Sequence, residues 1–152
     1  MTSAATILAC VLELLSASER NVPVELLEEV PADVSANAEA FVRRGEHRVY
    51  LITSTPNFRD AQRASRPCGS REPLLKLASI ITHEVWHLEH GGDEQGAYEA
   101  QLMALVKLGR GPDTMVYQGV RRSMRTVLQA QKDAAQATKS RIASARRADA
   151  AP

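Results

Sequence analysis

Apolar side chains recur at intervals of three and four residues in three segments of the chain, which is the spacing of one face of an α-helix. This pattern predicts helices over residues 4–19, 74–90 and 94–108. Little more than Gly91 and Gly92 separates the last two helices. We therefore expect these two helices to fold back as an antiparallel pair.

The first half of the chain carries shorter patterns. A β-branched and aromatic run over residues 48–53 predicts the one strand. Two prolines and a glycine predict a loop over residues 66–73. The remaining segments are interpreted as helical: a short turn at 24–29, a helix capped by Asp33 or Ser35 that ends at Arg44, and a short helix at 58–64. Together these elements predict a mainly α fold with a minor β element.

Composition supports this fold class. The 152 residues suit one domain, and 44% of them are apolar but only 4% aromatic, so we expect a core of Leu, Ile, Val and Ala. Such a composition favours helices over a β-sandwich or barrel. No apolar run reaches the length of a membrane span, and residues 6–15 lack the positive start of a signal peptide. We therefore expect a cytoplasmic protein.

Charge divides the chain into two parts. Residues 1–118 hold 11 basic and 16 acidic side chains, whereas residues 119–152 hold 8 basic and 2 acidic ones. This division predicts a single domain over 1–118, followed by a basic C-terminal tail over 119–152 that is helical or disordered. Apolar residues thin out after Leu128, so we expect about the last twenty residues to be frayed or disordered.

The partners of the tail are constrained by the same counts. The net charge of the whole chain is +1, which excludes a strongly basic nucleic-acid binder. The tail has no aromatic residue after Tyr117 and no heptad pattern of apolar residues. It is therefore interpreted as solvated, with an acidic partner as the alternative, and nucleic acid is not expected.

The strongest chemical pattern is His83-Glu84-Val85-Trp86-His87, which fits H-E-x-x-H. Residues four apart lie on one face of a helix, so both imidazoles can bind one metal ion, and Glu84 lies where it can act as general base. With 4 His and 12 Glu in the chain, the pattern is expected by chance roughly 0.008 times. Its place inside a predicted helix favours a metal site over a solvated helix face.

The segment Thr82-His-Glu-Val-Trp-His87 resembles the zincin superfamily of metallopeptidases. Glu94-Gln-Gly-Ala-Tyr98 is similar to the second-helix glutamate motif of small gluzincins, in which a Glu followed three residues later by an Ala carries the third ligand. The resemblance covers residues 48–108 and implies a compact zincin-like domain with an active-site helix and an antiparallel glutamate helix. It also implies one Zn²⁺ held by His83, His87 and Glu94, and hydrolysis of a peptide or protein substrate.

Three carboxylates compete as the third ligand. Glu94 fits the family motif, although its interval from His87 is shorter than in typical gluzincins. Glu99 lies one and a half turns further along the same helix, and Asp93 lies at the interval that metzincins use. Periodicity places Glu94 and Glu99 on either side of the buried face, so it does not decide between them. We favour Glu94, then Glu99, then Asp93, which also suits an N-cap.

Tyr98 lies one turn after Glu94, where the family often has an Asp. Its phenol is a candidate to stabilise the oxyanion of an intermediate. The competing interpretation of Tyr98 is a core tyrosine with its hydroxyl at the surface.

Cys10 and Cys68 are too few for a disulfide framework and lack zinc-type spacing. Arg66-Pro-Cys-Gly69 is loosely similar to the propeptide segment through which matrix metalloproteinases ligate their own zinc, so Cys68 is a candidate regulator of the site.

The sequence as a whole predicts a zinc-dependent metallopeptidase with Glu84 as general base. The alternatives are a zincin-like metal-binding protein that regulates or binds a partner without hydrolysis, and a helical domain that binds no metal.

Overall fold

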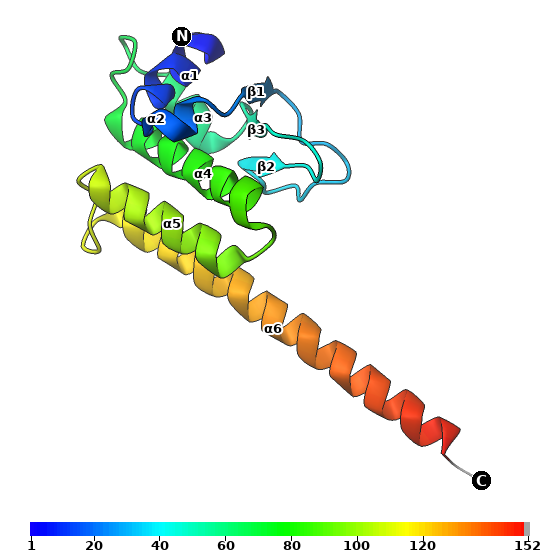
Figure 1. The fold of residues 1–152 in the computed structure, drawn as a ribbon. Coiled ribbons are helices and arrows are strands. Elements are labelled where there is room, and N and C mark those ends of the chain that lie inside the picture. The colour runs from blue at the N-terminus through cyan, green and yellow to red at the C-terminus, as the bar shows by residue number, and fades with distance from the viewer. Residues whose placement is uncertain (151–152) are drawn as a thin grey trace.

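The computed structural model describes residues 1–150. Helix α4 (Arg71–His90) runs through the middle of the molecule. Helices α1 (Ala4–Leu12) and α3 (Pro56–Gln62) and a small sheet lie on one side of α4, and α5 (Glu94–Lys107) lies on the other (Figure 1). The predicted fold class, mainly α with a minor β element, is confirmed.

The predicted helix over residues 4–19 is wrong in extent, because the chain forms two helices there: α1 and the short α2 (Ala17–Arg20). Ser16 begins the second helix with a capping box. Its hydroxyl accepts a hydrogen bond from Glu19 N, and the Glu19 carboxylate accepts one from Ser16 N at 2.9 Å. This arrangement satisfies N–H groups that a helix start leaves free, so it favours a new helix over a continued one.

The sheet has three strands in the order β1-β3-β2. The predicted strand is confirmed as β3 (Val49–Ile52), but β1 (Val24–Leu27) and β2 (Ala40–Val42) replace predicted helical segments. Strand β1 pairs parallel with β3, and β2 pairs antiparallel with its other side. The helical predictions at 24–29 and up to Arg44 are therefore wrong. Pairing with β3, a contact between distant parts of the sequence, overrides the local preference of both segments.

The main core fills the space between the sheet and α1, α3 and α4. As the composition predicts, its fully buried members are mostly aliphatic, with one aromatic residue: Ile7, Val11, Val49, Leu51, Leu77, Ile81 and Phe58. Helix α3 begins two residues earlier than predicted, because Thr55 caps it and Pro56 occupies its first turn. The core fixes one face of α4 and turns the opposite face towards α5.

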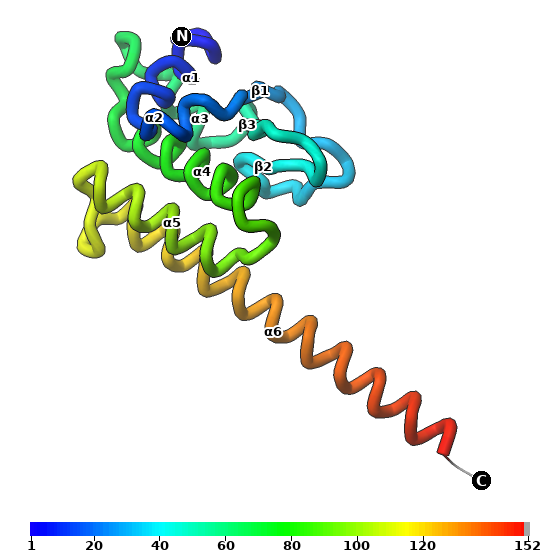
Figure 2. Tube along the Cα trace, viewed as in Figure 1, coloured from blue at the N-terminus to red at the C-terminus, as the bar shows by residue number. Residues whose placement is uncertain are grey.

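Helices α4 and α5 form the predicted antiparallel pair (Figure 1). Helix α6 (Met115–Asp149) packs on α5 through a second cluster, formed by Leu102, Leu105 and Val120, and then continues beyond the rest of the molecule (Figure 2). The expectation of a frayed tail is wrong up to Asp149, and residues 151 and 152 lie outside the described residues. Neither Gly nor Pro interrupts the helix after Gly119, and Ala, Gln, Lys and Arg are strong helix formers.

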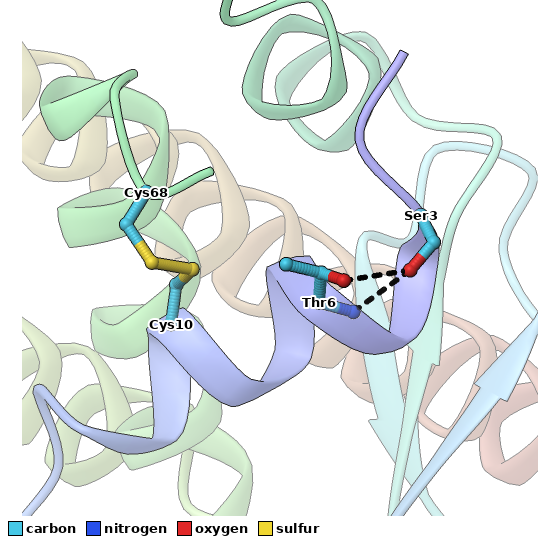
Figure 3. The surroundings of a disulfide bond; sticks show 4 residues. All are labelled: Ser3, Thr6, Cys10 and Cys68. Atoms are coloured by element: carbon cyan, nitrogen blue, oxygen red, sulfur yellow. Dashed lines mark hydrogen bonds between the residues drawn. A yellow bond between two sulfur atoms is a disulfide. The ribbon is translucent and has the colours of Figure 1, made fainter. Parts of the chain in front are cut away.

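Cys10 of α1 and Cys68 of the loop before α4 form a disulfide (Figure 3). The sequence did not predict this bond. A bonded sulfur has no thiolate to offer a metal, so the hypothesis that Cys68 ligates the site is wrong.

Within residues 1–150, no helix is both long enough and apolar enough to cross a membrane.

Candidate metal centre

Three side chains with metal-binding groups meet where α4 ends and α5 begins. His83 and His87 lie one turn apart on α4, and Glu94 is the first residue of α5. The atoms His83 Nε2 and His87 Nε2 are 3.2 Å apart. The Glu94 carboxylate lies 3.3 Å from His83 Nε2 and 3.5 Å from His87 Nε2. This group can hold a metal ion.

A tight turn brings Glu94 back to α4. Gly91 ends α4 with a φ of 86°, a conformation that favours glycine. The Asp93 side chain then accepts a hydrogen bond from Gln95 N and caps α5. Asp93 is therefore occupied as the predicted N-cap, and Glu94 is left in the first helical turn, facing the two histidines.

Gly96 allows α5 to approach α4 closely at this point. A Cβ atom added to Gly96 would lie 2.3 Å from Trp86 Cζ2, a distance that real Cβ atoms do not show. The indole of Trp86 therefore occupies the space that any larger residue at position 96 would need. This contact sets the distance between the start of α5 and the histidine-bearing face of α4.

The Nδ1 atom of each histidine has its own acceptor. His87 Nδ1–H donates to the Gly91 carbonyl at 2.7 Å, and His83 Nδ1 lies 3.1 Å from Gln101 Oε1. Gln101 lies on α5 and is 5% exposed. Metal-binding histidines commonly have such a partner on the nitrogen that does not face the metal.

A buried relay fixes which nitrogen of His83 carries the proton. Ser79 donates its one hydroxyl hydrogen to the Lys76 carbonyl at 2.7 Å. Its oxygen therefore accepts from Gln101 Nε2, 3.3 Å away. The amide oxygen of Gln101 then points at His83, and because this oxygen only accepts, His83 Nδ1 must donate. His83 Nε2 then faces Glu94 at 3.3 Å, so it donates to that carboxylate when protonated and presents its lone pair to a cation when not.

The histidines and Glu94 shift the pKa values of one another. Hydrogen bonding to Glu94 raises the pKa of His87 to about 9. Hydrogen bonds from His83 and then His87 lower the pKa of Glu94 to about 2. The carboxylate of Glu94 is therefore ionised across the whole physiological pH range and provides a negative charge at the site.

Glu84 and Tyr98 flank the three ligands. Glu84 is 9% exposed, and burial raises the pKa of its carboxyl, an effect that His83 and His87 partly oppose. The Tyr98 ring meets His83 edge to face, with 4.6 Å between ring centroids. Burial, followed by the charges of Glu94 and Glu84, raises the pKa of the Tyr98 phenol. The phenol therefore keeps its proton near neutral pH.

The other sequence candidates lie outside the cluster. Glu99 is exposed, and its carboxylate accepts a hydrogen bond from Gln95 Nε2 at 3.0 Å. His90, the last residue of α4, was not a sequence candidate and also lies outside the cluster, where it stacks on Trp86 with 4.4 Å between ring centroids. Of the three carboxylates that the sequence left open, the structure brings only Glu94 to the two histidines within residues 1–150.

Sequence reasoning missed Gln101 and Ser79. A signal for Gln101 exists, since it follows Glu94 by two helical turns and so shares its face of α5. Ser79 is likewise one turn before His83 on α4. Neither signal distinguishes these residues from ordinary buried polar side chains without the packing of the two helices.

Comparison of the chain with protein-family models, with curated proteins and with solved structures gives no match. Function is therefore inferred from the geometry and chemistry of the centre itself.

Proposed function

We propose that this protein is a zinc-dependent metallopeptidase, with His83, His87 and Glu94 as the zinc ligands. The spacing of the three groups carries the proposal. Zinc binds nitrogen and oxygen ligands at about 2.0–2.1 Å in a tetrahedron, whose edges then measure about 3.3–3.4 Å. The three observed distances are 3.2, 3.3 and 3.5 Å. The two distances from Glu94 end at different carboxylate oxygens, Oε2 for His83 and Oε1 for His87, so each pair of groups lies close to the edge length of a zinc tetrahedron. One ligand atom from each of the three residues lies within 4.8 Å of the others.

The donor set supports zinc in a catalytic rather than a structural site. Structural zinc sites use four protein ligands, whereas catalytic sites use three and leave a position for water or substrate. Two imidazoles and one carboxylate form a known catalytic set. The proposal is for one Zn²⁺ per chain.

The remaining residues supply acid–base chemistry. Zinc at such a site acidifies water towards neutral pH and polarises a carbonyl as a Lewis acid. Glu84 takes the proton of the attacking water and passes it to the leaving amine. Burial makes its carboxylate a stronger base than an exposed glutamate. The protonated Tyr98 phenol donates a hydrogen bond to the oxygen of the attacked carbonyl.

The sheet offers a place for an extended substrate. Strand β2 is an edge strand and packs against α4, the helix that carries both histidines. Ile52 N donates a hydrogen bond to the Glu39 carbonyl. Because hydrogen-bonded and non-hydrogen-bonded pairs alternate along an antiparallel ladder, the main chain of Phe41 also bonds to β3. The main-chain groups of Ala40 and Val42 point away from β3 and are open to another strand. An extended peptide can add to such an edge through main-chain hydrogen bonds.

The variant Glu84→Gln tests the catalytic part of the proposal. It keeps the side-chain size and removes the base, so zinc content should stay the same while cleavage of a fluorescently labelled protein substrate is lost. Glu89→Gln is the matched control, because Glu89 is an exposed glutamate of the same helix. Full activity in Glu84→Gln, or no cleavage by zinc-loaded wild-type protein, contradicts the proposal.

One observation favours the alternative of a metal-binding protein that regulates or binds a partner without hydrolysis. Strand β2 has 3 residues, which is a short edge on which to hold a substrate. Under this alternative the wild type binds one zinc ion, cleaves nothing, and behaves identically to Glu84→Gln in every assay.

The disulfide bears on location. A cytoplasmic protein stays a prediction of the sequence, but disulfides persist mainly in oxidising compartments. We propose that the Cys10–Cys68 bond forms where the protein works, so the location is an oxidising compartment rather than the cytoplasm. Alkylation of the protein in its native extract tests this: two labelled cysteines contradict the proposal, and none supports it.

A further inference from the structure

The outer part of α6 has no contact that explains it. Leu128 is the last partly buried residue of this helix, and every residue from Gln129 to Asp149 is exposed. At 1.5 Å per residue this part extends for about 30 Å. It leaves the molecule beside the end of α5 that carries Glu94 (Figure 1). Most of the stability of a helix in a protein comes from packing of one of its faces, and this part packs on nothing, so a partner would stabilise it.

Four basic residues form a line along this helix. Arg125, Lys132, Lys139 and Arg146 follow one another at intervals of seven residues, which we call the basic stripe. Seven residues are nearly two turns, so the line drifts by only about 20° per step and its cations lie about 10.5 Å apart.

The stripe is one-sided. Asp133 lies about 100° around the helix from its neighbour Lys132. Arg141 lies about 160° from Lys139 and is on the opposite side. The stripe is a row of positive charge about 32 Å long that turns by about 60° around the helix from its first to its last residue.

The composition of the outer helix argues against three other kinds of partner. Insertion into a membrane interface needs a face of large apolar side chains, and between Gln129 and Asp149 only Ile142 is one; purely electrostatic contact with anionic lipid is an outcome of the test. Single-stranded nucleic acid needs aromatic side chains on which bases stack, and this part has none. A protein interface needs a buried apolar or aromatic centre, which is missing for the same reason.

We propose that the basic stripe binds double-stranded DNA through its phosphates. Phosphate binding needs cations and no apolar surface, and it occurs without base recognition. The side of the helix opposite the stripe carries small residues: Ala130, Ala134, Ala137 and Ser144 each lie about 160° around the helix from a stripe residue two positions away. They keep the helix slim enough for the major groove of B-DNA, which admits an α-helix, whereas the major groove of duplex RNA is too narrow.

The geometry of α6 changes the interpretation of its charge. The sequence argued against nucleic acid from the net charge of the whole chain and from the lack of aromatic residues. In the structure five of the eight basic residues of this segment share one side of a helix whose outer part is exposed: Arg121, Arg125, Lys132, Lys139 and Arg146. Duplex phosphates need no aromatic residue.

The test is fluorescence anisotropy of a labelled 20-base-pair DNA duplex titrated with the full chain. If the stripe and Arg121 make about five phosphate contacts, log K falls against log salt with a slope of about −4.5. Affinity then falls about 500-fold between 50 and 200 mM salt. Zinc-loaded and chelator-treated protein should behave alike, so the outcome does not depend on the proposed metal chemistry.

Two single variants form a matched pair. Lys139→Gln should reduce the salt slope by about 1, whereas Arg141→Gln removes the same charge from the opposite side and should leave the slope unchanged. Gln is a good helix former, and circular dichroism of both variants checks that the helix persists. Equal effects of the two variants overturn the proposal. Tighter binding to duplex RNA, single-stranded DNA, polyglutamate or phosphatidylglycerol vesicles than to duplex DNA also overturns it.

Discussion

The buried relay from Ser79 through Gln101 to His83 makes a sharp prediction about metal affinity. Gln101→Leu replaces the amide with an apolar side chain of similar size and removes the acceptor of the His83 Nδ1 proton. His83 can then move its proton to Nε2, the nitrogen that faces Glu94, or turn its ring. Either change opposes metal binding, because a ligating histidine must present a lone pair.

The size of the effect follows from the role of this hydrogen bond. Removing the partner behind a ligating histidine reduces metal affinity about 10- to 100-fold, which equals about 1.4–2.7 kcal/mol. Gln101→Glu should differ from the leucine variant. Its carboxylate still accepts from His83 Nδ1, so zinc affinity should stay within a few-fold of wild type. Gln95→Leu is the control, because Gln95 is an exposed glutamine of the same helix.

Zinc affinity is measured by competition with a chromophoric chelator. The tautomer of His83 is read separately from its ring nitrogens by ¹⁵N NMR. Wild type and Gln101→Glu should show the proton on Nδ1, and Gln101→Leu should show a mixture of tautomers. If Gln101→Leu binds zinc like wild type with the same tautomer, the relay does not position His83. If Gln101→Glu is as weak as Gln101→Leu, acceptance from His83 Nδ1 is not what matters, because glutamate keeps both the acceptor and the shape and loses the hydrogen bond that the amide donates to Ser79.

Three further predictions concern stability. Cys10→Ser removes a disulfide that spans 58 residues, and the chain-entropy model then predicts a loss of about 4 kcal/mol in the free energy of unfolding. This loss is measured by urea unfolding under oxidising conditions, and an unchanged urea midpoint contradicts the prediction. Gly96→Ala should gain up to about 1 kcal/mol of helix propensity but lose more through the contact with Trp86, so its melting temperature should fall rather than rise. In chelator-treated protein, the raised pKa of His87 contributes stability that is complete below pH 6.5 and is lost as pH rises through about 9. The lowered pKa of Glu94 contributes stability that is complete above pH 4.5 and is lost as pH falls through about 2. The stability profile should therefore be highest between pH 4.5 and 6.5, and Glu94→Gln should flatten it on both sides; an unchanged profile in that variant contradicts the pairing.

The sequence predicted most where the signal is local. The two-histidine pattern and the antiparallel helix pair follow from helical spacing and a glycine turn, because both lie within a few residues of each other. The third ligand was left open among Glu94, which was favoured, Glu99 and Asp93. The choice depends on how far α5 is rotated about its axis, and the turn at Gly91 and the close contact at Gly96 set that rotation.

The sheet was harder to predict. Strands β1 and β2 have 4 and 3 residues, too few to show a period, and both exist because they pair with β3 from distant parts of the chain. The disulfide has the same origin, since nothing near Cys10 in the sequence indicates that α1 lies beside the loop of Cys68. Helix α6 was predicted as helix-prone but frayed, because apolar spacing is informative only where a helix packs on something.

Metal content is the sharpest test of the proposed zinc centre. Wild-type protein without a histidine tag is loaded with zinc, dialysed and analysed beside His87→Ala, Glu94→Gln and Glu99→Gln. We expect close to one zinc per chain in wild type and in Glu99→Gln, none in His87→Ala, and a clear loss in Glu94→Gln. No zinc in the wild type, or a loss in Glu99→Gln with retention in Glu94→Gln, contradicts the proposed centre.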